Sequence, residues 1–396
     1  MKRTTRSVGW ATFALWTVAV LSLTACSGGG GMGPPMPGMP NGSTSVNGST
    51  SMIDTDNSSE EADQDAGNSV LKHLNTTTTI GSTIDPIFGE LNPYGLDIAK
   101  TTSGGIAAGD LVVCNFNDSA NVQGTGRTII ALHPTAGSTP THIAADASLL
   151  GCNALAMSPT GFIWAAAFAA NDNPIVSGSG AILTTLPGGP WHHPFGQTFA
   201  PTAGKFGIAA FYESNAEDGS IVRIDIHPGP TFTFDVIADG FAVNGGAPGG
   251  ILSPSGLQYD AQHDRLYIVD GANNTLVSFK HVSTIPAGGI HVSGLTFSGP
   301  FAKRARVDFS GAPLNGPISS ALLPDGHLVL GNTLDPTGQN LMVEIAPHSG
   351  KVLDVKNVDT GAAGALFGMV ASGTSDANTT VWFNDDNANA VEALTH

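Results

Sequence analysis

The sequence predicts an all-β protein whose main part is a six-bladed β-propeller, a ring of six similar sheets. The composition is rich in glycine (51 of 396 residues), and only 12% of the residues are charged, which suits many short strands joined by tight turns. From about residue 75, apolar runs alternate with clusters of Gly, Asn, Asp and Pro, and hardly any segment keeps a helical period. A three-strand pattern then recurs six times, which indicates repeated blades.

Each copy begins with a strand led by Gly, Pro or Ser, continues with an apolar strand ending in Asn or Asp, and closes with a third strand after a turn. The copies are roughly 40 to 60 residues long, the size of propeller blades. The expected first strands are 93–99, 153–158, 195–200, 254–259, 317–323 and 367–372. The expected second strands are 110–118, 162–172, 206–215, 265–274, 327–332 and 380–387. The expected third strands are 128–133, 181–186, 220–227, 275–280, 341–346 and 390–395.

A fourth, outer strand follows several copies, as at 231–237 and 351–355, but the last copy ends with its third strand. Residues 75–84 (NTTTTIGSTI) are rich in threonine and precede the first copy. We expect them to supply the missing strand, because closing the ring removes exposed sheet edges. The propeller is therefore assigned to residues 71–396, with a two-domain β-sandwich as the alternative fold.

Residues 26–70 have the composition of a disordered tether. A glycine run, Met-Pro-Gly repeats and NGSTSVNGSTS lead into an acidic stretch between Asp54 and Asp65. Without aromatic residues or a periodic apolar face, this segment buries too little to offset its chain entropy. We expect it to act as a spacer.

Residues 1–25 have the features of a signal peptide. Lys2, Arg3 and Arg6 precede an apolar run from Trp10 to Leu23 that is too short for a membrane span. The following Leu-Thr-Ala-Cys resembles the lipobox of bacterial lipoproteins, which implies cleavage before Cys26 and acylation (palmitate and related chains) of that residue. The expected location is the cell envelope, lipid-anchored on the extracytoplasmic side. Ser27 after the cysteine favours the outer membrane if the host has one.

The charge of the mature chain limits its possible partners, and its cysteine content raises the question of a disulfide. Three of the 15 basic residues lie in the signal peptide, so the mature chain keeps 12 Lys and Arg against 32 Asp and Glu. This acidic balance argues against a nucleic-acid partner. With Cys26 acylated, Cys114 and Cys152 remain, either as an extracytoplasmic disulfide or as two buried thiols.

Two motifs point to a family. The blade sequence P-x-G-L…RLYIVDGANNTLVSF resembles the NHL-repeat class of six-bladed propellers. The opening NPYGLDIA…GDLVVCNFND…QGTGRTIIALHP resembles a group of exported bacterial NHL-type proteins without an assigned activity. The resemblance covers nearly all of residues 75–396 and implies the fold, but propellers host unrelated activities.

In the usual blade order, the turns between second and third strands and the entries to first strands share one face. Asx side chains gather there, and their oxygens suit a hard cation or a hydrogen-bonded ligand, although turns also select Asx residues to satisfy their own backbone. The candidate ligand-binding residues are Asn92, Asn117, Asp118, Asn153, Asp172, His193, Asp270, Asn273, Asp385 and Asp386. No cofactor is required by this pattern, and Ca²⁺ is the candidate ion because the 385–389 stretch is dense in oxygen ligands without EF-hand spacing.

The senescence-marker/gluconolactonase propellers also resemble this chain in layout, and they hold a divalent metal. Asp270 matches their Asp, but Ser255 stands where they have a metal-binding Asn, and Glu90 is displaced from their Glu-Gly-Pro opening. His193, beside His192 at the third-blade entry, has no accompanying metal-ligand spacing.

The sequence therefore favours a non-catalytic module that binds a protein, peptide or glycan. A lactonase-like, metal-dependent hydrolase or lyase in the pore is the alternative, and a structural lipoprotein of a larger envelope complex is a third hypothesis.

Overall fold

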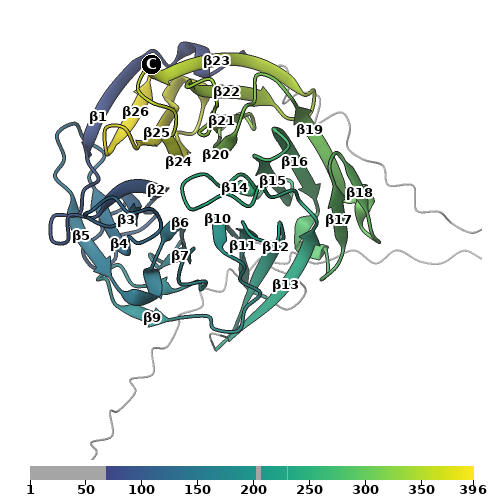
Figure 1. Cartoon of the computed structure of the whole chain (residues 1–396), viewed down its shortest axis with the longest axis horizontal. Coiled ribbons are helices and arrows are strands. Elements are labelled where there is room, and N and C mark those ends of the chain that lie inside the picture. Colours follow the sequence, from purple (N-terminus) through teal and green to yellow (C-terminus); the bar gives the residue numbers. More distant parts are fainter. Residues whose placement is uncertain (1–67, 202–206, 230) are drawn as a thin grey trace, which may run out of the picture. The chain divides into compact units, whose positions relative to one another are not determined.

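The computed structural model describes residues 68–201, 207–229 and 231–396. Six sheets of mainly antiparallel strands stand around one axis (Figure 1), and the helical elements in the described ranges are 3₁₀ turns of three residues. In each sheet the first strand lies next to the axis and the last at the rim. The expected all-β class and six-bladed propeller are confirmed.

Blades one to three follow the chain order. Blade one contains β2 (Leu91–Ile98), β3 (Leu111–Asn117), β4 (Thr128–Leu132) and β5 (Thr141–Ala145). Blade two contains β6 (Cys152–Met157), β7 (Ile163–Ala167), β8 (Ile175–Val176) and β9 (Ile182–Thr184). Blade three contains β10 (Pro194–Ala200), β11 (Ala209–Asn215), β12 (Ile221–His227) and β13 (Thr231–Asp239).

Blades four to six repeat the pattern. Blade four contains β14 (Pro254–Asp260), β15 (Arg265–Asp270), β16 (Thr275–Lys280) and β19 (Ala305–Ser310). Blade five contains β20 (Pro317–Leu322), β21 (Leu328–Asn332), β22 (Asn340–Ala346) and β23 (Lys351–Asp359). Blade six contains β24 (Leu366–Ser372), β25 (Thr380–Asp385), β26 (Ala390–Thr395) and β1 (Thr76–Ser82).

The ring is closed by the N-terminal strand, as expected. β1 pairs antiparallel with β26, with Thr76 opposite Thr395 and Ser82 opposite Ala390 (Figure 1). The 3₁₀ turn η1 (Leu71–His73) precedes it and buries Leu71 against blades five and six. The first and last segments of the ring are thus held in one sheet, and β26 is paired along both of its edges.

The expected third strand of blade two, 181–186, was wrong. Ile175 and Val176 of β8 pair with Trp164 and Ile163, and β9 (Ile182–Thr184) forms the outer, fourth strand. The preceding strand also ends at Ala167 rather than at 172. A two-residue strand directly after a proline gives no recognisable alternation in the sequence, whereas the longer run at 181–186 does.

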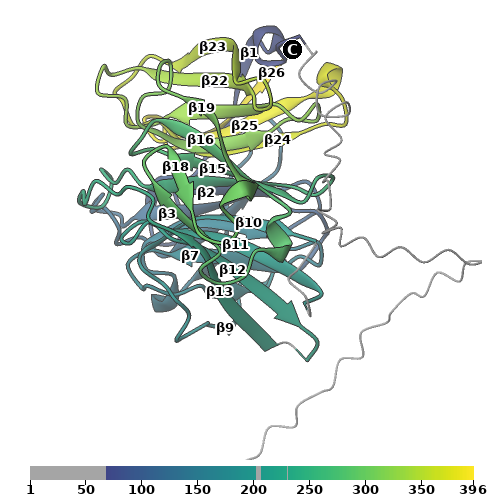
Figure 2. The same cartoon turned by 90° about the vertical axis from the view of Figure 1, so that its right-hand side faces the viewer.

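A hairpin at the rim was not expected. β17 (Ile290–Ser293) pairs parallel with β13 and antiparallel with β18 (Thr296–Ser298), which extends the sheet of blade three (Figures 1 and 2). The hairpin lies between β16 and β19 in the sequence, so the chain adds two strands to blade three before β19 completes blade four.

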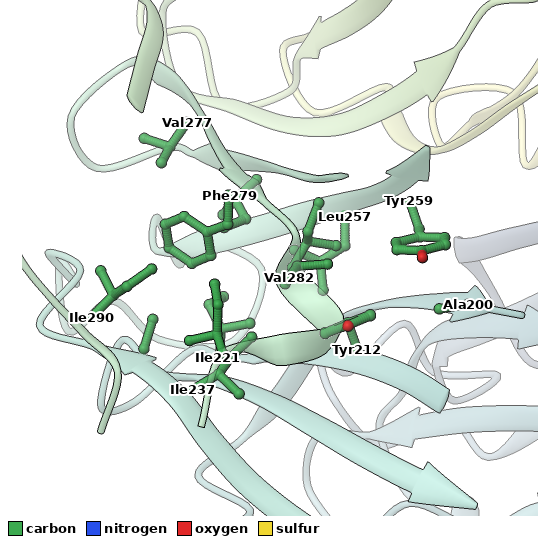
Figure 3. Close-up of a cluster of buried hydrophobic side chains, with 14 of the residues drawn as sticks. Ala200, Tyr212, Ile221, Ile237, Leu257, Tyr259, Val277, Phe279, Val282 and Ile290 are labelled. Atoms are coloured by element: carbon green, nitrogen blue, oxygen red, sulfur yellow. The ribbon is translucent and has the colours of Figure 1, made fainter. Parts of the chain in front are cut away.

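The hydrophobic core is divided among the spaces between neighbouring blades. Figure 3 shows one such cluster, in which Tyr212 and Ile221 of blade three meet Leu257 and Phe279 of blade four. Packing of alternate side chains from facing sheets explains why every strand needs an apolar set.

Blades one and two are also joined covalently, because Cys114 of β3 and Cys152 of β6 form a disulfide with their Cα atoms 5.3 Å apart. In the described residues no helix is long and apolar enough to cross a membrane. The expected signal peptide, Cys26 and most of the tether lie outside the described residues.

Candidate functional site

The candidate residues lie at one end of the strands. Antiparallel pairing sets Leu91 opposite Asn117, so the start of the inner strand meets the end of the second strand. The same relation holds for Pro254 and Asp270 and for Leu366 and Asp385. We call this end of the ring the strand-end face. The structure places at this face all ten predicted residues: Asn92, Asn117, Asp118, Asn153, Asp172, His193, Asp270, Asn273, Asp385 and Asp386.

Several of these side chains hold the turns in which they lie. Oδ1 of Asp118 accepts hydrogen bonds from the backbone N–H groups of Val122 and Ala120, and the Val122 bond contributes most to lowering the pKa of Asp118. Asp270 accepts both the backbone and the side-chain N–H of Asn273. These contacts are typical Asx-turn chemistry, so part of the predicted site is structural.

Other Asx residues bond to the loop that leads from blade two into blade three. The amide of Asn153 donates to the carbonyl of Phe195 over 2.7 Å. Oδ1 of Asp172 accepts from the backbone N–H of Leu186, and the backbone N–H of His193 donates to Oδ1 of Asn171. These side-chain contacts help to fix the loops of this face.

Several buried oxygen atoms in blades six and one and in the segment that joins them receive no hydrogen bond from the described residues. They are Thr83 Oγ1, Asn92 Oδ1, Asn115 Oδ1, Asn117 Oδ1 and Asn384 Oδ1. Amide and hydroxyl oxygens of this kind suit Ca²⁺ and equally suit ordered water. The expected Ca²⁺ therefore stays a prediction.

Aromatic side chains close the pore beneath this face. The ring of Tyr94 stacks between Phe116 and Phe367, with centroids 4.2 and 3.6 Å apart, and Phe168 contacts Phe116 and Phe195. These residues form one buried cluster with Ile251 and Ile318. Tyr94, Phe195 and Phe367 of this cluster, together with the inner strands, line a cavity of about 120 Å³, which has room for several water molecules but not for a drug-sized ligand.

A loop at 241–253 extends over the axis toward blade one (Figure 1). Oδ1 of Asn244 accepts the backbone N–H groups of Gly246 and Leu252, so the loop is held by its own contacts. At its tip Pro248 approaches blade one, since a Cβ at Gly124 would lie 3.4 Å from the Cβ of Pro248. The loop adds a second layer above the aromatic cluster.

An acidic pair lies beside the aromatic cluster. Burial, reinforced by the neighbouring Asp385, raises the pKa of Asp386 to about 7. Burial, with a smaller effect of Asp386, raises the pKa of Tyr94 well above its ordinary value. These groups lie close enough to interact, and they make Asp386 the candidate residue whose charge changes near neutral pH.

An exposed apolar patch on blade one is the feature that sequence reasoning missed. Ile84, Ile87 and Phe88 precede β2, Val122 precedes β4, and their exposed fractions are 41, 65, 43 and 50%. The two loops adjoin, because a Cβ at Gly89 would lie 3.4 Å from the Cβ of Ser119. Four apolar residues in two adjacent turns were a detectable signal, since turns are usually polar.

Two buried carboxylates hold the loop that carries Ile84, Ile87 and Phe88. Oδ1 of Asp85 accepts the backbone N–H groups of Ile87 and Phe88, and its Oδ2 lies 2.6 Å from Nδ1 of His142. Oε2 of Glu90 accepts the backbone N–H of Arg127 over 2.6 Å. The loop therefore presents its apolar side chains from a fixed backbone.

Asp325, His327 and Glu344, at the other end of blade five, are close enough to hold a metal ion. Nδ1 of His327 lies 2.8 Å from Oδ2 of Asp325 and 3.0 Å from Oε1 of Glu344. However, Glu344 also accepts hydrogen bonds from Ser69 Oγ and from the backbone N–H groups of Val70 and Leu71. This set of contacts anchors the chain segment that leads into β1.

Burial alone lowers the pKa of His327, but hydrogen bonds to Asp325 and Glu344 outweigh that effect and raise it to about 10. His327 is therefore protonated at neutral pH, where it neutralises part of the buried carboxylate charge. A charged, hydrogen-bonded pair of this kind is stable only while all partners are present.

The residues aligned with gluconolactonase-type ligands have other contacts. Ser255 Oγ donates to the carbonyl of Val269, Asp270 is bonded to Asn273, and Glu90 is bonded to Arg127 in blade one. The structure brings Ser255 near Asp270 through the pairing of β14 with β15. Glu90 belongs to the blade-one loop and is directed to Arg127.

Neither a family model nor a curated protein matches the sequence. Among solved structures, the chain is similar to one in the crystal structure of a nidogen/laminin complex, with 13% identity and a TM-score of 0.50 over 72% of this chain and 87% of that chain. It also matches selenomethionine-substituted virginiamycin B lyase from Staphylococcus aureus, with 14% identity and a TM-score of 0.48 over 81% of this chain and 99% of that chain. At these identities the first likeness shows the propeller fold alone.

Proposed function

We propose that the protein is a lipid-anchored, extracytoplasmic propeller of the NHL-repeat type that binds a protein or peptide at its strand-end face without a catalytic step. The observation that supports this proposal most directly is the apolar patch of Ile84, Ile87, Phe88 and Val122 on fixed loops. Exposed apolar side chains grouped on one face are typical of interaction surfaces.

The fixed loops favour binding energetically. Asp85 and Glu90 already hold the loop that carries Ile87 and Phe88, so binding orders little additional backbone. Asp118 lies in the second loop, where the hydrogen bond from the backbone N–H of Val122 lowers the pKa of its carboxyl. A partner segment with apolar side chains flanked by Lys or Arg complements this surface.

The catalytic alternative has less support from the pore. Stacked aromatic rings narrow it on the side of the strand-end face, and the cavity that they line measures about 120 Å³. A hydrolase acting in the pore needs a substrate to reach this space, and typical ligand pockets are about 300–1,000 Å³. The surface loops are the better candidate.

The proposal can be tested by site-specific photo-crosslinking in the native envelope. A photoreactive residue at Ile87 or Val122 is expected to capture the same protein or peptide. The matched control is Leu183 on the outer strand of blade two, whose exposed fraction of 51% is close to the 50% of Val122.

Replacement Ile87→Asp should abolish the adduct formed from position 122, because it places a charge in the apolar patch. Equal adducts from positions 87, 122 and 183, or adducts only from 183, would refute binding at the strand-end face.

A further inference from the structure

A buried glutamate lies between blades two and three. Glu213 of β11 is 0% exposed and pairs with Gln197 of β10 across the sheet. Nε2 of Gln197 donates to Oε2 of Glu213 over 3.2 Å and to Oδ1 of Asn173, in blade two, over 3.1 Å. Within the described residues, Oε1 of Glu213, Oε1 of Gln197 and Nδ2 of Asn173 have no hydrogen-bond partner. The three side chains thus form a closed polar pocket whose hydrogen-bonding capacity is only partly used.

The propeller fold does not require a carboxyl group at this position. In three other blades the first pair after the register shift of the inner strand is apolar: Leu96 with Val113, Leu257 with Ile268, and Met369 with Phe383. In blade three the corresponding pair is Gln197 with Glu213. Asn173 reaches this pair because blade two departs from the repeat, with β7 ending at Ala167 and β8 only two residues long. The pocket is therefore a particular feature of this interface.

The strands around Glu213 provide no counter-charge for it. β6, β7 and β8 of blade two, and β10 of blade three, contain no Asp, Glu, His, Lys or Arg. On β12, Val222 lies opposite Glu213, whereas Arg223 and Asp225 project from the other face of the sheet. An ionised Glu213 would therefore be a buried and unpaired charge, which proteins tolerate poorly.

The nearby loops add a charge of the same sign. His192 and His193, before β10, have their contacts elsewhere. The charged group that acts on Glu213 is the carboxylate of Asp172, which precedes Asn173. Burial raises the pKa of Glu213 well above its ordinary value of 4.5, and Asp172 adds to this effect.

We infer that Glu213 is a pH sensor built into this interface: its carboxyl is neutral while the interface is closed, and loss of its proton opens the segment around Asn173. Ionisation requires water in the pocket, and water can enter when the bridge between Ala167 and Asp172 breaks. Opening also frees Asp172 from the backbone N–H of Leu186, which it holds in the closed state. This inference concerns the contact of blades two and three and does not depend on the proposed function.

Proton linkage gives the direction and the size of the effect. The open segment binds the proton with the ordinary pKa of 4.5, whereas the closed interface holds it more tightly. The closed state is therefore fully favoured below pH 4.5 and loses this advantage as the pH rises toward the raised pKa. In that range the opening equilibrium constant should increase about tenfold for each pH unit.

The test uses the chain from residue 26 with Cys26→Ala, which keeps every described residue. Hydrogen exchange of single backbone amides is compared between this parent and its Glu213→Gln variant at several pH values from about 6 to 8. The reporters are the N–H groups of Ala165 and Ala167, which donate to the carbonyls of Pro174 and Asp172. The ratio of the two exchange rates, parent over variant, should rise about tenfold for each pH unit, because the intrinsic pH dependence of exchange cancels and only the parent loses a proton.

Two further variants make the comparison specific. Glu213→Met follows the apolar residues at this register in the other blades, and it should give the same rising ratio. Glu217→Gln is the matched control, because Glu217 lies just after β11 and its side chain is 60% exposed; its ratio should not change with pH.

A ratio independent of pH for both Glu213 variants would overturn the inference. A rise shared by the amides of β25, on another side of the ring (Figure 1), would exclude a local opening. If a metal chelator accelerates exchange in the parent but not in Glu213→Gln, a bound ion and not a proton neutralises Glu213, and the inference also fails.

Discussion

Removal of the closing strand should destabilise the whole ring. The perturbation is an internal deletion of residues 69–84, which removes η1 and β1 and leaves β26 without its partner. Exposed strand edges promote aggregation. The deletion also leaves the buried carboxylate of Glu344 without its three donors from Ser69, Val70 and Leu71.

The size of the effect follows from what the segment buries. Val70, Leu71, Leu74 and Ile80 are 0–3% exposed, and burial of such a side chain contributes about 1.5–3 kcal/mol. The four together contribute about 6–12 kcal/mol, which is comparable to the whole stability of a typical domain, about 5–15 kcal/mol. We therefore expect the deletion to remove most or all of the cooperative unfolding transition.

The assay is urea denaturation followed by tryptophan fluorescence, with light scattering to measure association. The control is deletion of residues 31–66, whose composition offers little apolar surface to bury, so its unfolding midpoint should stay near that of the parent. If the 69–84 deletion is a monomer as stable as the control, closure by β1 does not stabilise the ring and the reasoning fails. If instead the 31–66 deletion is strongly destabilised, the acidic stretch contributes to the fold.

Three further changes test other parts of the molecule. Cys26→Ala should prevent lipidation, so that the protein accumulates as a precursor or is released from membranes; unchanged migration and detergent partitioning would contradict the lipoprotein assignment. Replacement of both Cys114 and Cys152 by Ser should lower the free energy of unfolding by about 4 kcal/mol, because the disulfide closes a loop with a sequence separation of 38; an unchanged urea midpoint would show that the bond contributes nothing. The raised pKa of His327, about 10, gives stability that is complete below the ordinary value of 6.5 and is lost as pH rises through 10; His327→Gln should flatten the fall in stability between pH 7 and 10, and an unaltered pH profile would exclude this role.

The blade pattern could be predicted from sequence because each blade repeats a local code. An inner strand such as β20, an apolar strand ending in Asx such as β21, and a turn recur in nearly every copy. Closure by β1 could be predicted because the last copy contains three strands where a blade needs four. The repeated pattern did not predict elements that were too short or irregular, as for β8 and for the hairpin of β17 and β18.

The candidate site was predicted less completely because it depends on residues that meet only after folding. Asx residues such as Asp118 were found, but their use within turns depends on backbone geometry that residue type alone does not give. Ser69 and Glu344 are 275 positions apart, and Arg265 and Arg306 meet only through the register of β15, β16 and β19. Such long-range groups leave no local pattern.

The two ends of the ring differ in the residues that they present, and the N-terminal segment joins the ring at only one of them. At the strand-end face, fixed loops expose Ile87, Phe88 and Val122 beside carboxylates such as Asp118. At the opposite end, the His327–Glu344 contacts hold the incoming N-terminal segment. A protein bound at the strand-end face would therefore leave free of contact the residues that hold the N-terminal segment.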